Sequence, residues 1–187
     1  MADYLELPED LPVPEDDGAA EHLPGRGLPA LHMPATHGDT VALDTLPTGR
    51  TVLYLYPMTG RPDVALPEGW NDIPGARGCT PESCGFRDHH AELREAGAQA
   101  VYGLSSQSTD YQREVAARLG LPFPLLSDPQ LDLAQALALP TFVVEGERLY
   151  RRLTLIVSGG VIEHVFYPVF PPDTHASQVL SWLRAMR

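Results

Sequence analysis

The amino-acid sequence predicts an α/β fold in which helices flank a mixed central sheet. Two observations predict it. Short β-branched or aromatic runs alternate along the chain with amphipathic helical segments, which is typical of parallel strands connected by helices. Near the end, two strand-like runs follow each other across Ser158-Gly159-Gly160, a turn sequence that favours an antiparallel hairpin. The sheet should therefore contain both parallel and antiparallel neighbours.

The composition describes an ordinary globular chain of 187 residues, with 43% hydrophobic and 20% charged residues. This length fits one domain with a sizeable core. The net charge of −12 argues against nucleic acid or an anionic membrane as a partner, because both attract basic surfaces. No apolar run has the length of a membrane span, and the start of the chain is acidic. We therefore expect a cytoplasmic protein.

The first half of the chain contains an arm, a buried strand and a long loop. Residues 1–28 are rich in proline and acidic side chains and are predicted to form an N-terminal arm, with the domain covering 29–187. TVALDTL is a short strand-like segment, and the continuous run TVLYLY at 51–56 predicts a strand buried on both faces. Residues 57–78 form an insertion loop rich in proline and glycine; loops of this length are uncommon and often functional.

The remaining elements follow from capping signals and periodicity. Thr80-Pro81-Glu82 predicts a helix start with Thr80 as the cap, and the helix should continue to Gly97. The later segments are expected as strands at 98–106, 123–128, 141–144, 152–157 and 161–166, and as helices at 109–120, 129–138 and 174–186.

Both cysteines of the chain lie at the start of the helix predicted from Thr80. Cys79 should sit where exposed N–H groups and the helix dipole favour an anion, which raises the thiolate fraction. Cys84 is five residues further along. On an ideal helix, this separation places the two Cα atoms roughly 8–9 Å apart, beyond the limit of about 7 Å for a disulfide. A bond between them requires the first turn to unwind, which suits a catalytic cycle better than a permanent cross-link.

Two such thiols fit peroxide chemistry. A thiolate attacks the O–O bond and becomes a sulfenic acid, a second thiol condenses with it to a disulfide, and an external dithiol restores the pair. The first cysteine needs an activating cation nearby. The chain contains no lysine, so this cation must be an arginine or a histidine.

Three motifs in order along the chain, YPMT…GCTPESCGFRD, LLSD and RRLTLIV…GGVIEHVF, resemble peroxiredoxins of the bacterioferritin-comigratory (Q) type. The resemblance covers residues 28–187 and implies a thioredoxin-like three-layer sandwich. It implies that Cys79 is the peroxidatic cysteine, that Cys84 resolves it, and that Arg152 holds the thiolate. It also implies a thiol peroxidase for hydrogen peroxide and organic hydroperoxides, reset by thioredoxin or a similar dithiol, with no metal or organic cofactor. We expect a monomer.

One position departs from the family pattern. The family has a threonine three residues before the peroxidatic cysteine, and this chain has Ala76 there. We assign the missing hydroxyl to Thr59, which follows the strand end where the motif normally lies; Thr80 is the other hydroxyl nearby. The insertion can cap the pocket with Trp70 as an apolar wall, or it can be a surface elaboration on which Trp70 packs, and the sequence does not choose between them.

Other interpretations of the same residues were weighed. Cys79, Cys84, His89 and His90 suggest a metal site, but their spacing is not a standard zinc pattern, and a solvated helix face is the simpler interpretation of the histidines.

Arg151 competes with Arg152, because neighbours on a strand point to opposite faces and periodicity does not say which face meets Cys79. A second function from another class, a redox-sensing or binding module whose Cys79–Cys84 disulfide switches a partner surface, would differ from an enzyme by oxidising once rather than turning over.

Overall fold

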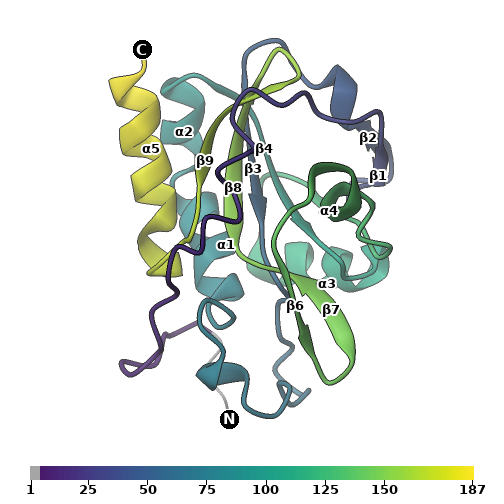
Figure 1. The fold of residues 1–187 in the computed structure, drawn as a ribbon, viewed down its shortest axis with the longest axis vertical. Helices are drawn as coiled ribbons and strands as arrows, with labels where there is room; N and C mark the ends of the chain where they lie inside the picture. The colour runs from purple at the N-terminus through teal and green to yellow at the C-terminus, as the bar shows by residue number, and fades with distance from the viewer. Residues whose placement is uncertain (1–4) are drawn as a thin grey trace.

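A computed structural model describes residues 5–187 and contains a five-stranded central sheet in the order β5–β4–β3–β8–β9 (Figure 1). β3 pairs parallel with β4, which pairs parallel with β5, while β8 and β9 are antiparallel additions on the other side of β3. The mixed sheet expected from the sequence is confirmed. The strands span Arg50–Leu55 (β3), Ala98–Ser105 (β4), Leu125–Ser127 (β5), Leu153–Ser158 (β8) and Val161–Phe166 (β9).

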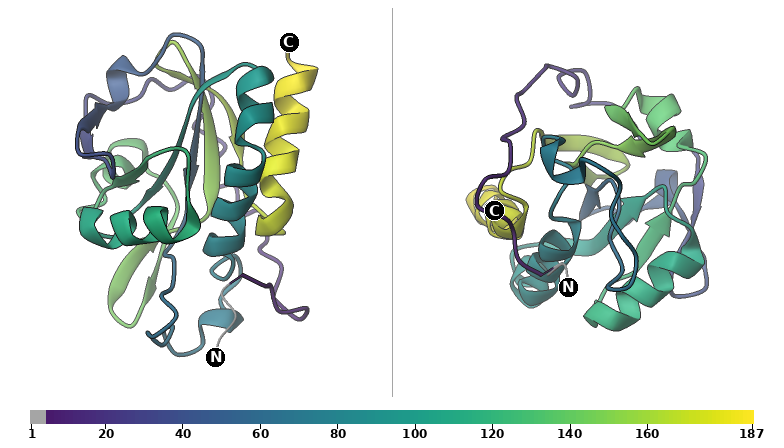
Figure 2. Two further views of the ribbon diagram at one scale, coloured as in Figure 1. Left: turned by 180° about the vertical axis from the view of Figure 1, so that it is seen from behind. Right: turned by 90° about the horizontal axis from the view of Figure 1, so that it is seen from below.

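Helices α1 (Cys79–Asp88) and α2 (His90–Glu95) follow each other end to end, and α5 (His175–Ala185) lies beside them on one face of the sheet (Figure 2). Their apolar side chains meet those of β3 in a buried core that includes Tyr54 and Phe86, whose rings stack 4.3 Å apart. Burial of these large aromatic groups supplies much of the hydrophobic stabilisation on this face. Helix α1 is therefore packed both against the sheet and against α5.

The opposite face of the sheet is covered by shorter elements. These are the hairpin of β1 (His32–Pro34) and β2 (Thr40–Ala42), the 3-10 turn η1 (Leu43–Thr45) and helix α4 (Asp132–Leu137).

Helix α3 (Thr109–Leu119) packs against β5 and ends at Gly120 in the left-handed conformation, as its sequence predicts. The result is the expected three-layer sandwich.

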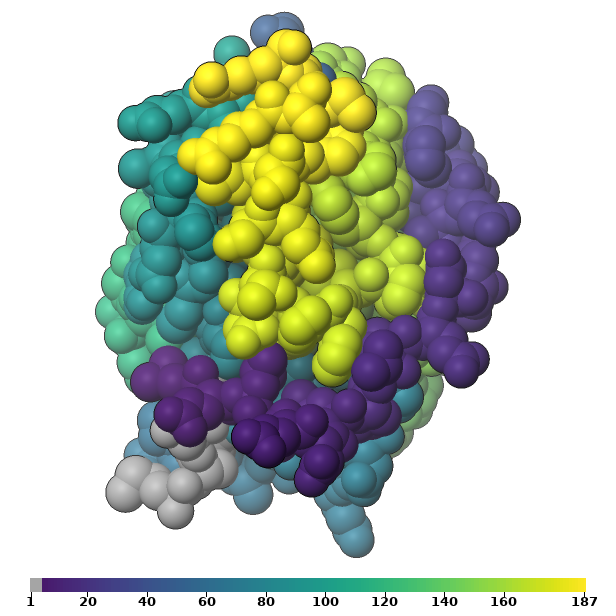
Figure 3. Space-filling view, turned by 90° about the vertical axis from the view of Figure 1, so that its left-hand side faces the viewer, coloured from purple at the N-terminus to yellow at the C-terminus, as the bar shows by residue number. Residues whose placement is uncertain are grey.

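The N-terminal arm lies along the surface of the domain, and in Figure 3 its purple segment crosses below α5. Its end is part of the core, because Ala20, Leu23 and Leu28 are buried with the side chains under α4. The backbone N–H of Leu28 donates to the carbonyl oxygen of Gly160 at 2.8 Å, so this end also pairs with the turn of the β8–β9 hairpin.

Three local features differ from the sequence expectation. The helix predicted to run to Gly97 is interrupted at His89, whose φ of −95° and ψ of 6° separate α1 from α2. The sequence reading missed β1 and also β7 (Glu147–Tyr150), which pairs with β6 (Thr141–Val144) as a hairpin that projects from the domain. Two further 3-10 turns, η2 (Trp70–Asp72) and η3 (Pro172–Thr174), lie close to the start of α1. No helix within residues 5–187 has the length and apolar character needed to cross a bilayer.

Candidate active site

Cys79 is the first residue of α1 and is only 2% exposed. The residue before it, Gly78, has φ = 109°, a left-handed conformation that favours glycine. A Cβ at Gly78 would also lie 2.3 Å from Cγ of Pro172, so no side chain fits there. The cap of the helix is thus Gly78 rather than Thr80. Pro81 is tolerated inside the first turn because N–H groups there have no partner within the helix.

Arg152 reaches the thiol because of the register of β8. Leu153, Leu155 and Val157 face the core under α4, whereas Ile156 faces the core of α1 and α5. Residues two apart on a strand share a face, so Arg152 points with Ile156 towards α1 and Arg151 points away. Of the two arginines between which periodicity alone does not choose, Arg152 is the one that contacts Cys79.

The guanidinium of Arg152 holds the loop before α1 and the thiol together. Its Nη2 lies 3.3 Å from Cys79 Sγ. The same nitrogen donates to the carbonyl oxygens of the three consecutive residues 75–77, at 3.3, 3.1 and 3.3 Å. Its Nη1 donates to the carboxylate of Glu82, and both side chains of this ion pair are buried. Within residues 5–187, the Nε of Arg152 has no hydrogen-bond partner.

Glu82 is a site residue for which the sequence suggests either a weak base near Cys79 or, more simply, charge at a helix start. It lies three residues after Cys79, on the same side of α1, and is fully buried. Its i,i+3 spacing from the cysteine is the signal that could have identified it. One buried arginine therefore faces two acidic groups, the thiol and the carboxyl.

Cys79, Arg152 and Glu82 form a buried triad, and its electrostatics do not lower the pKa of the Cys79 thiol. Burial raises the pKa of Cys79, the charge of Arg152 lowers it, and the charge of Glu82 raises it again, with a net upward direction. Burial likewise raises the pKa of Glu82 to about 7, against the lowering effect of Arg152. Burial disfavours the charge of Arg152, but Cys79 and Glu82 outweigh it and raise its pKa. The expectation that the helix end and an arginine alone would make this thiol acidic omitted burial and Glu82.

Glu82 and Cys79 thus compete for the stabilisation that Arg152 provides, and we expect Glu82→Gln to lower the pKa of Cys79. The substitution removes a negative charge that raises this pKa and leaves Arg152 to the thiolate. The measurement is the pH dependence of Cys79 alkylation by iodoacetamide, made in a Cys84→Ser background so that one thiol reacts. The midpoint should move to lower pH.

A matched control for this prediction is Glu95→Gln, which removes an exposed carboxylate at the end of α2 and should leave the midpoint unchanged. An unchanged or higher midpoint in Glu82→Gln would show that the carboxylate acts by holding Arg152 in place rather than by its charge.

Cys84 is half-buried on the same helix, and both thiols are free. Because α1 is continuous from Cys79 to Asp88, ideal helical geometry keeps the two Cα atoms about 8–9 Å apart. Burial raises the pKa of Cys84, while Arg87 lowers it. In this conformation the pair is separated, as the sequence predicts for the reduced state.

Thr59 is buried, and its hydroxyl donates to Oε1 of Gln107 at 3.2 Å. Gln107 also accepts from the Thr59 N–H at 2.9 Å and donates to its carbonyl oxygen at 3.1 Å. The backbone of the neighbouring Met58 lowers the pKa of Cys79. Met58 and Gly60 line the hollow at Cys79, but Thr59 between them does not, and its hydroxyl is bonded to Gln107.

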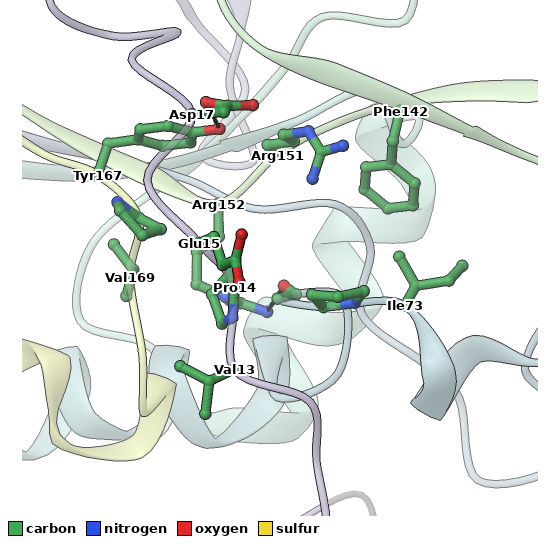
Figure 4. Close-up of a pocket in the computed structure, with 13 residues that line it drawn as sticks. Val13, Pro14, Glu15, Asp17, Ile73, Phe142, Arg151, Arg152, Tyr167 and Val169 are labelled. Atoms are coloured by element: carbon green, nitrogen blue, oxygen red, sulfur yellow. Dashed lines mark hydrogen bonds between the residues drawn. The ribbon is translucent and has the colours of Figure 1, made fainter.

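Two hollows border the triad. A small one of about 10 Å³ lies at Cys79 between the insertion and the start of α1, and Thr80 is among the residues that line it. A larger one of about 400 Å³ borders Arg152 and is closed on one side by the arm (Figure 4). There Arg151 lies 5.8 Å from the ring centroid of Phe142, and the hydroxyl of Tyr167 donates to Asp17 at 2.9 Å.

The histidines after α1 are engaged away from the two cysteines. His89 contacts Glu92 at 3.0 Å and Ser177 at 3.1 Å through its two ring nitrogens, and the ring of His90 lies 5.7 Å from that of Phe123. Over the part of the chain that the structure describes, no group of three or more histidine, cysteine, aspartate or glutamate side chains is arranged to hold a metal ion.

Comparison with known proteins places the chain in a family. Residues 23–180 match the family model described as Redoxin. Peroxiredoxin Bcp of Escherichia coli (strain K12) is 30% identical over 165 residues, which cover 83% of this chain and 92% of the relative. The bcp peroxiredoxin of Coxiella burnetii is 30% identical over 163 residues, covering 85% and 97%.

A solved structure shows the same relationship. Peroxidoxin BcpB of Mycobacterium tuberculosis matches with a TM-score of 0.71 and 27% identity, over 88% of this chain and 98% of the other. The mixed five-stranded sheet and the two thiols on α1 agree with this assignment. The chain therefore belongs to the redoxin family, as a peroxiredoxin of the Bcp/Q type and a thiol peroxidase with a thioredoxin-like fold.

Proposed function

We propose that Cys79 reduces hydroperoxides by direct attack on the O–O bond. The Cys79 thiolate attacks the terminal oxygen of ROOH, the O–O bond breaks, and the departing RO⁻ takes up a proton and leaves as ROH. The sulfur is oxidised to sulfenic acid and the peroxide is reduced to water or an alcohol. The observation that carries this proposal is the 3.3 Å contact between Arg152 Nη2 and Cys79 Sγ at the start of a helix.

Arg152 serves both states of the reaction. Its positive charge stabilises the thiolate before attack and the negative charge on the departing oxygen during it. Burial raises the pKa of Glu82 to about 7, so this carboxyl can be protonated near neutral pH. When it is protonated, it carries no negative charge, and Arg152 stabilises the thiolate instead. We propose that Thr59 completes the site, because Gln107 fixes the segment whose residues Met58 and Gly60 line the hollow at Cys79.

Cys84 resolves the sulfenic acid in this proposal. Its thiol attacks the sulfur of Cys79, a disulfide forms and water leaves. Because the helix separates the thiols, the first turn of α1 must unwind before this step. A dithiol of thioredoxin then reduces the disulfide, in a thioredoxin-dependent, atypical two-cysteine cycle. We further propose that the protein acts as a monomer in the cytoplasm.

Replacing Cys84 by serine tests this cycle. In stopped-flow measurements with one peroxide type and a thioredoxin system, Cys84→Ser should consume about one peroxide per chain in a rapid phase and then stop, because the sulfenic acid has no partner thiol. Thiol titration and intact mass before and after should show one oxidised Cys79. Full multiple turnover with thioredoxin would mean that Cys84 is not the resolving residue, and absence of the rapid phase would count against Cys79 as the peroxidatic one.

A further inference from the structure

The insertion at residues 57–78 is packed onto the domain next to the thiol. Its Trp70 is 3% exposed and lies in a small apolar core with Ala76 and Leu149. The ring centroid of Trp70 is 6.0 Å from that of Phe142 in β6. Both alternatives weighed from the sequence are thus met in part, because Trp70 packs on the domain and also borders the hollow at Cys79.

Trp70 lies between two hollows of very different size. The inner one, at Cys79, measures about 10 Å³, which is close to the minimum needed for one water molecule. The outer one measures about 510 Å³ and is formed by the insertion itself. Three residues line both hollows and therefore form the wall between them: Leu66, Trp70 and Arg77.

The chemistry of the two hollows differs as their sizes do. The inner hollow is the space in which a peroxide must place its oxygens to meet Cys79 Sγ, and only a very small molecule fits there. The outer hollow is lined by the apolar side chains of Ala65, Leu66, Pro67 and Trp70 on one part and by the polar side chains of Asn71, Asp72 and Arg77 on the other. It has room for the hydrocarbon body of an organic hydroperoxide, but in this conformation the tryptophan separates that body from the thiol.

We propose that Trp70 sets the size selectivity of the peroxidase. Hydrogen peroxide, with two heavy atoms, needs only a slight movement of this wall to reach Cys79. An organic hydroperoxide places its –OOH group at Cys79 only when the indole moves aside and joins the two hollows, and its apolar body then occupies the outer one. This inference rests on the proposed peroxidase function and adds to it the class of substrate that the insertion disfavours.

The test compares substrates rather than overall rates. Stopped-flow second-order rate constants for oxidation of Cys79 would be measured with hydrogen peroxide, tert-butyl hydroperoxide and cumene hydroperoxide. In the natural sequence the rate constant should fall in that order. In Trp70→Ala, the ratio of the cumene to the hydrogen peroxide rate constant should rise about tenfold or more, the scale on which a change in an apolar pocket discriminates substrates.

Two further variants keep the test decisive. Trp182→Ala is the matched control, because this other tryptophan lies on α5 and stacks on His164; its ratio should equal that of the natural sequence. Trp70→Phe retains an aromatic packing residue in case alanine prevents folding, and its ratio should lie between those of Trp and Ala.

The size selectivity assigned to Trp70 and the proposed peroxidase function can be disproved separately. If hydrogen peroxide oxidises Cys79 but the ratio is the same in the Trp70 variants as in the natural sequence, the selectivity inference is overturned and the peroxidase function stands. A natural sequence that already prefers cumene hydroperoxide would overturn it too. If none of the three peroxides oxidises Cys79 in the natural sequence, the proposed function itself fails.

Discussion

Cys79→Ser is expected to lower the rate of peroxide consumption to the background rate of the thioredoxin system without this protein. A serine hydroxyl does not ionise near neutral pH, and it lacks the sulfur that accepts the peroxide oxygen. The sulfur–oxygen bond that begins the cycle therefore does not form. The contacts of the site should survive, because serine can still accept a hydrogen bond from Arg152. The measurement is peroxide loss with the thioredoxin system, together with the thermal unfolding midpoint to show that the fold is retained.

The comparison variant for this result is Cys84→Ser, which removes the other thiol and should keep the first, rapid oxidation. Residual turnover in Cys79→Ser, with Cys84 becoming oxidised instead, would reverse the roles of the two cysteines.

Arg152→Leu is expected to affect both catalysis and stability. The variant loses the cation that stabilises the thiolate and the departing oxygen, so the rate constant for oxidation of Cys79 should fall roughly 10²–10³-fold. It also leaves Glu82 buried without its partner and three loop carbonyls without their donor. Loss of one partner of a buried ion pair costs about 3–5 kcal/mol, which urea unfolding would detect at a pH where Glu82 is ionised.

Arg151→Leu provides the matched control, because it makes the same substitution one residue earlier on the opposite face of the chain. It should change the oxidation rate little. Since Glu82 has a raised pKa of about 7, the stability defect of Arg152→Leu should shrink as the pH is lowered and the carboxyl takes up a proton. An equal loss of activity in both variants would indicate that the general positive charge of this region, rather than the geometry of Arg152, drives the reaction.

The sheet and the main helices could be predicted because each has a local signal. The run at 51–56 has only β-branched, aromatic and leucine side chains, and all of it except Tyr56 pairs in β3 as a central strand. Gly120 ends α3 in the left-handed conformation that glycine favours. β7 was missed because its sequence, ERLY, is short and half polar. The signal for its hairpin is Glu145-Gly146, whose two positive φ angles form the turn.

The site could be predicted only as far as the thiols and the choice of two arginines. Which arginine meets Cys79 depends on the pairing of β8 with β3, which is a property of the sheet rather than of the local sequence. The ion pair of Arg152 with Glu82 joins residues 70 positions apart, and an acidic residue in a first helical turn is ordinary. The sequence offers Trp70 either as an apolar wall or as a packing residue, and its place against Phe142 of β6 depends on tertiary packing that no local signal shows.

The N-terminal arm touches the part of the molecule that changes shape in the proposed catalytic cycle. Leu7 lies against Gly78 and Pro14 against Gly75, so these arm residues contact the loop that leads into α1. In that cycle the first turn of α1 unwinds so that the two sulfurs can meet. The loop before α1 then moves, and the arm loses its contacts with Gly78 and Gly75. Thermodynamic reciprocity then requires that a docked arm disfavours the disulfide by the same factor by which the disulfide disfavours docking. The N-terminal arm should accordingly be cleaved by proteases at different rates in the reduced and the oxidised protein. Its exposure would therefore report whether the disulfide between Cys79 and Cys84 has formed.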